Sequence, residues 1–327
     1  MDPHTLHVPD AASEALPEVA TGALPEVATG ALSGTVSGRA LPEDARAVHR
    51  RLDVRGTQLH IAEYGDGTPL LMLHGFPQHW YAWHKVAALL PQGYRLICPD
   101  LRGFGWSGLT RRGYGMDGLA DDALALLDAL ELTGPVGLVA HDWGAHVGFR
   151  LCLRAPERFT GYLALNMSHP WPRHRAVLPN LWRLWYTAFV EYPVLGRAVL
   201  RHWPAFTRFL LRHQVTDPAV WTEAETDEYA AATSVSAAAV QSMFWQYVLH
   251  DIPALLRGTW RGHRLAVPTL LLGGEEDNVV VPSMLAGAEP YADALTVRLV
   301  PGAGHYLPQE RPAEVAEAIR TTFATQS

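Results

Sequence analysis

Short apolar runs of strand length recur along most of this chain and are separated by segments with helical spacing. Seven such runs lie at residues 59–62, 70–73, 95–98, 136–139, 162–165, 269–272 and 295–300. Most are continuous rather than alternating, which is typical of strands buried on both faces of a parallel sheet. Strands that alternate with helices indicate an α/β fold, so we expect a doubly wound, mostly parallel sheet.

The alternation stops between residues 168 and 262. Trp, Tyr, Arg and Leu recur there at helical spacing, and the segment holds seven of the 11 tryptophans. We expect an inserted helical cap over the carboxyl ends of the strands, where open α/β sheets bind ligands. The core then consists of residues 46–167 and 263–327.

The first 45 residues have a different character. The octapeptide ALPEVATG occupies residues 15–22, is repeated at 23–30, and a degraded copy follows at 31–38. A segment with Pro, Gly and few large apolar side chains cannot offset the entropy of ordering, so we expect a flexible tail. No basic residue precedes Arg39, and the charged region that begins a signal peptide is therefore missing.

Composition narrows the possible partners. The chain has 327 residues, about half of them apolar, and a net charge of −7, which offers no basic surface to nucleic acid. It has no uncharged apolar run of about 18 residues, so no membrane span is predicted. Cys98 and Cys152 fall in a predicted strand and a predicted helix, which favours buried thiols in a reducing compartment over a disulfide. We expect a cytoplasmic protein.

Asp142 stands at a position that carries chemistry in many α/β folds. It follows the apolar run 136–139, has the small residues Ala140 and Gly144 two positions away on either side, and precedes a helical pattern. A tight strand-to-helix turn of this kind needs small neighbours so that the central side chain projects outward. The pattern predicts a nucleophile elbow with an aspartate in place of the usual serine.

Two later strand ends complete a hydrolase order of nucleophile, acid and histidine. Asp277 ends the segment GGEED after the run 269–272, and His305 ends GAGH after the last run. We expect Asp277 to orient His305. Glu275 and Glu276 adjoin Asp277, and Asp251 in the cap segment is a further alternative, so this assignment stays open.

The segment His74-Gly75-Phe76-Pro77 also follows a strand. The backbone N–H of Phe76 is placed to join that of Trp143 in an oxyanion hole. Four motifs at matching strand ends are stronger evidence than any of them alone.

With these motifs in place, the chain from about residue 51 to its end resembles the α/β-hydrolase fold superfamily and, within it, the epoxide hydrolases, close to the haloalkane dehalogenases. The resemblance is carried by HGFP at 74–77, DLRGFGWSG at 100–108, HDWG at 141–144, LNMSHP at 165–170, GEED at 274–277 and GAGHYLPQERP at 302–312. It implies a small lipophilic substrate, water as the second substrate and no cofactor. It also places His74, Pro77, Trp143 and Trp185 at the substrate.

The aspartate itself restricts the reaction. A serine that attacked an epoxide or alkyl halide carbon would leave an ether, whereas a carboxylate leaves an ester that water can cleave. Asp142 therefore points to displacement at saturated carbon. His305 would then activate water against the ester, with the oxyanion held by the N–H groups of Phe76 and Trp143.

The leaving group separates two reactions. Epoxide opening produces a basic alkoxide that needs a proton donor, while a halide leaves as a stable anion. The resemblance places one ring-opening tyrosine at Tyr186, in WYTAF, and the second at Tyr247, in FWQY. Tyr229 is a rival for the second position. We expect hydrolysis of an epoxide to a vicinal diol.

Two alternatives remain. A haloalkane or haloacid dehalogenase would keep Asp142, Asp277 and His305 and use the Trp143 side chain as a halide donor, but Phe76 stands where a second donor is often found. A ligand-binding receptor would not need every catalytic residue. The string GFGWSG at 103–108 matches a dinucleotide fingerprint without a following helix start, and no HExxH motif occurs, so neither a cofactor nor a metal is expected.

Overall fold

An eight-stranded sheet forms the centre of the protein. The computed structural model describes residues 39–324 except 91–92. The strand order is β1-β2-β4-β3-β5-β6-β7-β8. β1 and β2 pair antiparallel, β2 pairs antiparallel with β4, and all other pairs are parallel. The strands are β1 (Val48–Val54), β2 (Thr57–Tyr64), β3 (Thr68–Leu73), β4 (Tyr94–Pro99), β5 (Val136–His141), β6 (Phe159–Leu165), β7 (Thr269–Gly274) and β8 (Leu295–Val300). This is the expected α/β fold.

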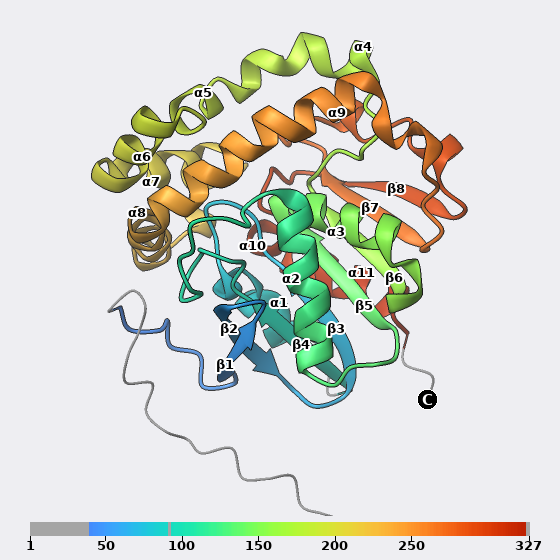
Figure 1. Ribbon diagram of the computed structural model, residues 1–327, viewed down its shortest axis with the longest axis horizontal. Coiled ribbons are helices and arrows are strands. Elements are labelled where there is room, and N and C mark those ends of the chain that lie inside the picture. Colours follow the sequence, from blue (N-terminus) through green and yellow to red (C-terminus); the bar gives the residue numbers. More distant parts are fainter. Residues whose placement is uncertain (1–38, 91–92, 325–327) are drawn as a thin grey trace, which may run out of the picture. The chain divides into compact units, whose positions relative to one another are not determined.

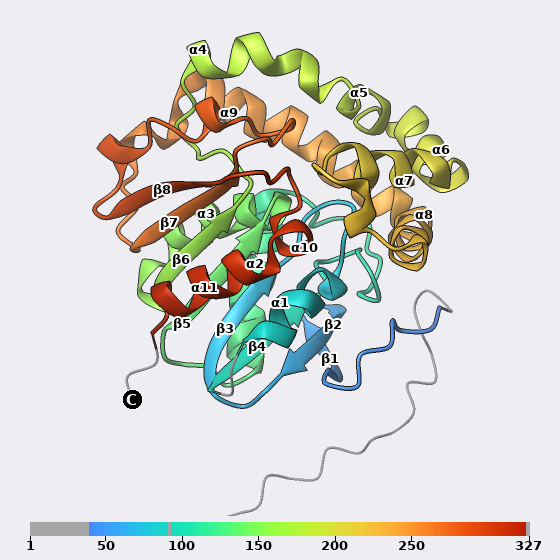
Figure 2. The ribbon, with the colours of Figure 1, turned by 180° about the vertical axis from the view of Figure 1, so that it is seen from behind.

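Helices cover both faces of the sheet. α2 and α3 lie on the face seen in Figure 1, and α1, α10 and α11 lie on the face seen in Figure 2. Side chains of one strand alternate between the two layers: Leu71 and Leu73 of β3 join the core under α2 and α3, and Leu70 and Met72 join the core under α1 and α11. The helices outside the insertion are α1 (His84–Leu89), α2 (Met116–Ala129), α3 (Trp143–Arg154), α10 (Leu307–Glu310) and α11 (Pro312–Thr322), with short 3₁₀ turns η1 (Trp80–Trp83), η2 (Pro156–Arg158), η7 (Pro282–Met284) and η8 (Glu289–Tyr291).

All seven apolar runs become strands, and one strand has no apolar run. β1, with the sequence VHRRLDV, pairs at the edge of the sheet, and most of its residues are only half-buried. An edge strand with one neighbour needs little apolar surface, so its pattern is too polar to be recognised.

Between β6 and β7 the described chain is helical. The elements are α4 (His174–Val177), η3 (Leu178–Leu184), α5 (Thr187–Val190), α6 (Pro193–His202), α7 (Pro204–His213), η4 (Pro218–Val220), α8 (Glu223–Gln246), a π-helical turn η5 (Tyr247–Asp251), α9 (Ile252–Arg257) and η6 (Thr259–Gly262). Both ribbon views show α4 and α5 on the far side of α8 from the sheet. The insertion belongs to the same compact unit as the sheet, and the boundaries of a separate cap stay a prediction.

The octapeptide repeat, at residues 15–38, lies outside the described residues. From Arg39 onward the predicted tail packs against the core: Arg39 pairs with Glu228 of α8 and lies over the ring of Trp106. Asp44 accepts a hydrogen bond from the hydroxyl of Tyr64 at 3.2 Å.

Two smaller expectations concern thiols and membranes. Cys98 and Cys152 are buried free thiols, as expected. Over the described residues, no helix has the length and apolar character needed to cross a membrane.

Candidate active site

Asp142 sits in a strained turn between β5 and α3. Its backbone has φ +49° and ψ −124°, a conformation that a non-glycine residue adopts only when its surroundings enforce it. The neighbouring chain passes very close, because a Cβ at Gly75 would lie 2.5 Å from the Asp142 Cβ and one at Gly144 would lie 2.4 Å from the Leu73 carbonyl oxygen. The small residues therefore do what the sequence pattern requires: they let the turn close.

His305 and Asp277 meet at the ends of β8 and β7. His305 Nδ1 donates to Asp277 Oδ2 at 3.0 Å. The backbone N–H groups of Val279 and Val280 donate to Asp277 Oδ1 at 2.8 and 2.9 Å. Asn166, directly after β6, donates from Nδ2 to Asp277 Oδ2 at 2.9 Å and to the Gly304 carbonyl at 3.0 Å. The Asp277 carboxylate is thus buried and fully hydrogen bonded.

The two oxygens of Asp142 have different neighbours. Oδ2 accepts a hydrogen bond from the backbone N–H of Phe76 at 2.9 Å. Oδ1 lies 3.6 Å from Nε2 of His305, beyond normal hydrogen-bond range. One oxygen is therefore held by the backbone, while the other faces the histidine.

These charges shift one another's pKa values. Burial opposes the ionised form of Asp142, but the nearby positive charge of His305 and the N–H of Trp143 outweigh it and lower the pKa of Asp142. Burial also opposes the charged form of His305, yet the carboxylates of Asp277 and Asp142 raise the pKa of His305 to about 10. In the free protein at neutral pH, a histidinium therefore sits between two carboxylates.

Two further histidines support the backbone of the site. His141 donates from Nε2 to the carbonyl of His305 at 2.8 Å. His74 is fully buried, donates from Nδ1 to the Gly75 carbonyl and accepts at Nε2 from the Leu101 N–H, both at 3.0 Å. We expected His74 at the substrate, but both of its ring nitrogens are used to hold the loop that carries Phe76. Pro77, the next residue of that loop, is also buried.

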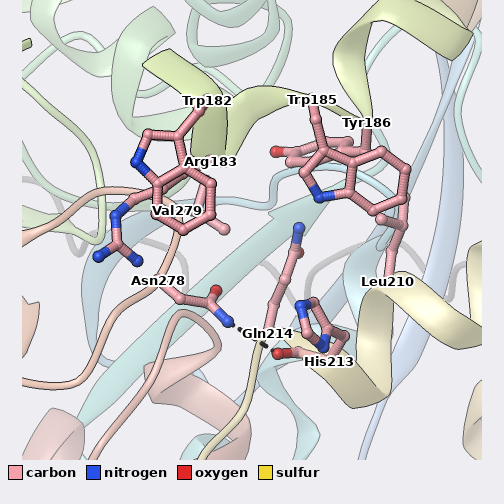
Figure 3. A pocket seen from close by; sticks show the side chains of 9 residues that line it. All are labelled: Trp182, Arg183, Trp185, Tyr186, Leu210, His213, Gln214, Asn278 and Val279. Carbon is pink, nitrogen blue, oxygen red and sulfur yellow. Dashed lines mark hydrogen bonds between the residues drawn. The ribbon is translucent and has the colours of Figure 1, made fainter. Parts of the chain in front are cut away.

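A cavity of about 120 Å³ lies between the helical insertion and the loop after β7. Figure 3 shows it with Trp182, Trp185 and Tyr186 along one side and Gln214 below them. Burial is the main reason that the pKa of Tyr186 is raised, and the negative charge of Asp142 adds to it, while a hydrogen bond from Gln214 acts the other way. Tyr186 is therefore near the nucleophile and fully protonated at neutral pH.

Tyr247 lies near the C-terminal end of the insertion in sequence, and its ring packs against Trp143, the residue after Asp142. It begins the π-helical turn η5 after α8. Its ring meets that of Trp143 edge-on at 4.9 Å and that of His146 at 5.3 Å. Burial raises the pKa of Tyr247. π-helical turns are rare and often occur at functional positions.

The same turn is fixed to α3 by a buried ion pair. Arg150 pairs with Asp251, the last residue of η5, and its guanidinium lies 3.7 Å from the ring centroid of Trp260. Asp251 therefore has its own partner and does not orient His305. Glu275 and Glu276 are exposed, which leaves Asp277 as the carboxylate on the histidine.

Tyr229, the rival of Tyr247, lies elsewhere. It is fully buried on α8, with its ring 4.8 Å from His79 and 5.8 Å from Trp221. Burial raises the pKa of Tyr229, and the carboxylates of Glu225 and Asp100 add to that rise. The ring of Tyr247, by contrast, meets that of Trp143, the residue after Asp142. The geometry favours Tyr247 over Tyr229.

The dinucleotide-like string at residues 103–108 forms a loop next to Asp100. The loop at residues 103–108 wraps around Asp100, which accepts from the N–H of Trp106 at 2.8 Å, and a helix begins only at Met116. Among the described residues, no group of three or more His, Cys, Asp or Glu side chains is arranged to hold a metal ion.

Three residues of the site were missed by the sequence reasoning: Asn166, His141 and Gln214. Asn166 had a usable signal, because it directly follows a predicted strand just as Asp142 does and also has a positive φ, +48°. Gln214 has no such signal, since only the fold brings the end of α7 to Tyr186.

Comparisons with known proteins agree with the fold described above. The family model described as alpha/beta hydrolase fold matches residues 68–312. Epoxide hydrolase 3 of Xenopus tropicalis is 29% identical over 284 residues, covering 83% of this chain and 76% of that protein.

Two solved structures are also similar. The structure of wild-type Cfl2 from Burkholderia cenocepacia has a TM-score of 0.76 at 28% identity, covering 86% of this chain and 98% of that one. Epoxide hydrolase VrEH1 from Vigna radiata has a TM-score of 0.73 at 26% identity, with the same coverages of 86% and 98%. From the family match, the sheet order and the residues at the strand ends, we conclude that the chain belongs to the α/β hydrolase fold family.

Proposed function

We propose that the protein hydrolyses lipophilic epoxides to vicinal diols through an ester on Asp142. The observation that carries the proposal is the position of the Asp142 carboxylate, with one oxygen on the Phe76 N–H and the other facing His305. Two protonated phenols are available: Tyr186, whose pKa the charge of Asp142 helps to raise, and Tyr247, whose ring meets that of Trp143. Relatives named as epoxide hydrolases support the choice of substrate.

In the first step, Oδ1 of Asp142 attacks an epoxide carbon and the C–O bond of the ring breaks. The ring oxygen takes a proton from Tyr186, with Tyr247 as the second donor. The raised pKa of each tyrosine keeps the proton on the phenol until the alkoxide forms. This step leaves a neutral ester and one tyrosinate.

Ester formation changes the state of His305. One of the two carboxylates that raise its pKa is lost, so the histidinium becomes more acidic. Its proton passes to the tyrosinate and restores the phenol. A neutral imidazole, oriented by Asp277, now stands next to the ester.

In the second step, His305 removes a proton from water, and the resulting hydroxide attacks the ester carbonyl. The oxyanion lies on the N–H groups of Phe76 and Trp143. When the ester bond breaks, the departing alkoxide takes the proton of the carboxylic acid. The protein returns to its starting charges, and the net reaction is epoxide plus water to diol.

The aromatic lining by Trp182 and Trp185 favours an aryl or alkyl epoxide. The reaction as written needs no cofactor or metal. We place it in the cytoplasm, on the two buried free thiols.

The test is to trap the ester. The variant His305→Asn should accumulate an adduct with styrene oxide, which intact-mass analysis would detect and peptide mapping would place on Asp142. The matched control, His305→Asn with Asp142→Ala, should show none. An adduct with 1-bromobutane but with no epoxide would replace the proposal with a dehalogenase, and no adduct with either would favour a binding protein.

A further inference from the structure

Exposed apolar side chains are concentrated in one stretch of the insertion. Of the 17 large apolar side chains exposed in the described part of the chain, ten fall between residues 178 and 209. Trp182 is 67% exposed and Trp203 53%. Monomeric proteins rarely expose contiguous apolar patches of large size without a partner. The ten are Leu178, Leu181, Trp182, Trp185, Phe189, Tyr192, Val194, Leu195, Trp203 and Phe209.

Ring contacts connect four of the aromatic members, and a fifth, Trp182, lines the same cavity as Trp185. The ring of Trp185 lies 5.9 Å from Phe189 and 6.2 Å from Phe209, although Phe209 belongs to a different helix. Trp203 joins them through the buried ring of Phe206. We call Trp182, Trp185, Phe189, Trp203 and Phe209 the outer patch. The ribbon views place α5 at the outside of the molecule, beyond α8.

Positive charge accompanies this patch. Residues 173–213 contain seven arginines, no lysine and one acidic residue, Glu191, in a chain whose net charge is −7. Five of the arginines are exposed: Arg173, Arg175, Arg197, Arg201 and Arg212. The stretch is thus a basic region on an acidic protein.

Few of these cations are neutralised within the protein. Across the described residues, the only ion pair of this stretch joins Arg208 to Asp227, and Arg197 bonds instead to the neutral side-chain amide of Gln241. Arg212 lies one helical turn from Phe209, and Arg201 is two residues from Trp203. Arg212 and Phe209 therefore lie on the same face of α7, and Arg201 is close to Trp203 in sequence.

Exposed Trp and Phe next to Arg are typical of protein segments that lie in the headgroup region of a membrane. The rings enter the boundary between headgroups and acyl chains, and the arginines attract anionic lipid. We infer that the outer patch docks on the surface of an anionic phospholipid bilayer. A second copy fits poorly, since a twofold contact would place the arginines of both copies against each other.

The outer patch and the cavity share two residues. Trp182 and Trp185 belong both to the outer patch and to the lining of the cavity that holds Tyr186 (Figure 3). A docked protein would take a lipophilic substrate directly from the bilayer. This last point rests on the proposed epoxide chemistry, whereas docking itself does not.

Vesicle flotation of the full chain, without substrate, tests the docking. The protein should float with vesicles of phosphatidylglycerol and phosphatidylcholine and stay behind with pure phosphatidylcholine. Arg201→Gln with Arg212→Gln should weaken binding about 25-fold, since each basic residue near the surface contributes a factor of about five. Trp203→Gln with Phe209→Gln should weaken it about tenfold per ring.

Matched controls lie outside the patch. Arg112→Gln with Arg298→Gln removes two exposed arginines elsewhere, and Leu109→Gln with Leu299→Gln removes two exposed leucines. Both should bind vesicles like the parent chain. Equal losses in controls and patch variants, or no flotation with anionic vesicles, would overturn the inference.

Two other results would assign the patch to a different occupant. A dimer in sedimentation velocity that the patch variants dissociate, without vesicle binding, would assign it to a second copy. Vesicle binding only after removal of residues 1–38, which carry five acidic and no basic side chains, would assign it to that segment. Failure of the styrene oxide experiment, by contrast, would leave the vesicle result unchanged.

Discussion

The proposed active site has two halves that are built differently. At the sheet edge, Asp142, Asp277 and His305 follow three parallel strands, and buried hydrogen bonds from Asn166, Val279 and Phe76 fix their carboxylates. In the helical insertion, Tyr186 and Tyr247 are half-buried and are held mainly by aromatic rings and one amide.

The difference matches the two tasks. A nucleophile and a base must meet the same reacting carbon and carbonyl for every substrate, so fixed geometry helps them. Proton donors must reach an oxygen whose position varies with the substrate. We therefore expect the sheet half to determine the type of reaction and the helical half to determine which molecules undergo it.

The largest test of this division removes both phenols. Tyr186→Phe with Tyr247→Phe should lower epoxide turnover by about 10²–10⁴-fold, because a positioned general acid contributes a factor of that size. The ester on Asp142 should form correspondingly slowly in rapid-quench measurements. A bromoalkane, whose leaving group needs no proton, should be affected far less.

The matched control is Tyr229→Phe, on the same insertion. Tyr229 is fully buried against the rings of His79 and Trp221 and not against Trp143, so turnover should stay within about twofold of the parent. A loss equal to that of the double variant would show that the helical half acts through its packing and not through two donors.

A second test concerns the buried ion pair between Arg150 of α3 and Asp251 of the insertion, which connects the two halves. Asp251→Asn leaves Arg150 buried without its counter-ion and should destabilise the fold by about 3–5 kcal/mol, measured by urea unfolding. Replacing both partners, Arg150→Met with Asp251→Leu, should restore most of that stability. If turnover returns together with stability, the pair only holds the fold; if turnover stays low while stability returns, the pair also positions Tyr247.

The most gradual effect concerns the sheet half: its free energy of unfolding should depend on pH through His305. His305 has a pKa of about 10 in the fold, against an ordinary value of 6.5. The stabilisation from its charge is complete below pH 6.5 and is lost as the pH rises toward 10, by at most about 1.4 kcal/mol per pH unit. Urea unfolding between these limits should show this fall, and His305→Gln should lack it.

The sheet half was largely predictable from sequence because its signals are local. Asp142, Asp277 and His305 each follow an apolar run, and the parallel fold brings the ends of such runs to one edge. Asn166 satisfies the same rule. It was missed because an asparagine after a strand carries no nucleophilic or acidic signal of its own.

The helical half was less predictable because its contacts depend on packing. Gln214 lies 28 residues after Tyr186 in sequence, and no periodicity links the two. The π-helical turn that carries Tyr247 has the sequence YVLHD, which gives no sign of a widened turn. Edge strand β1 was missed for a related reason, since partial exposure removes the apolar signal.

The backbone at Asp142 has a consequence for how this chain can change. A glycine would adopt φ +49° without strain, so that substitution would relieve the backbone of the turn while removing the proposed nucleophile. Relief of backbone strain favours glycine at position 142, whereas the proposed activity requires aspartate. A library screened only for thermal stability would therefore enrich catalytically inactive variants at position 142.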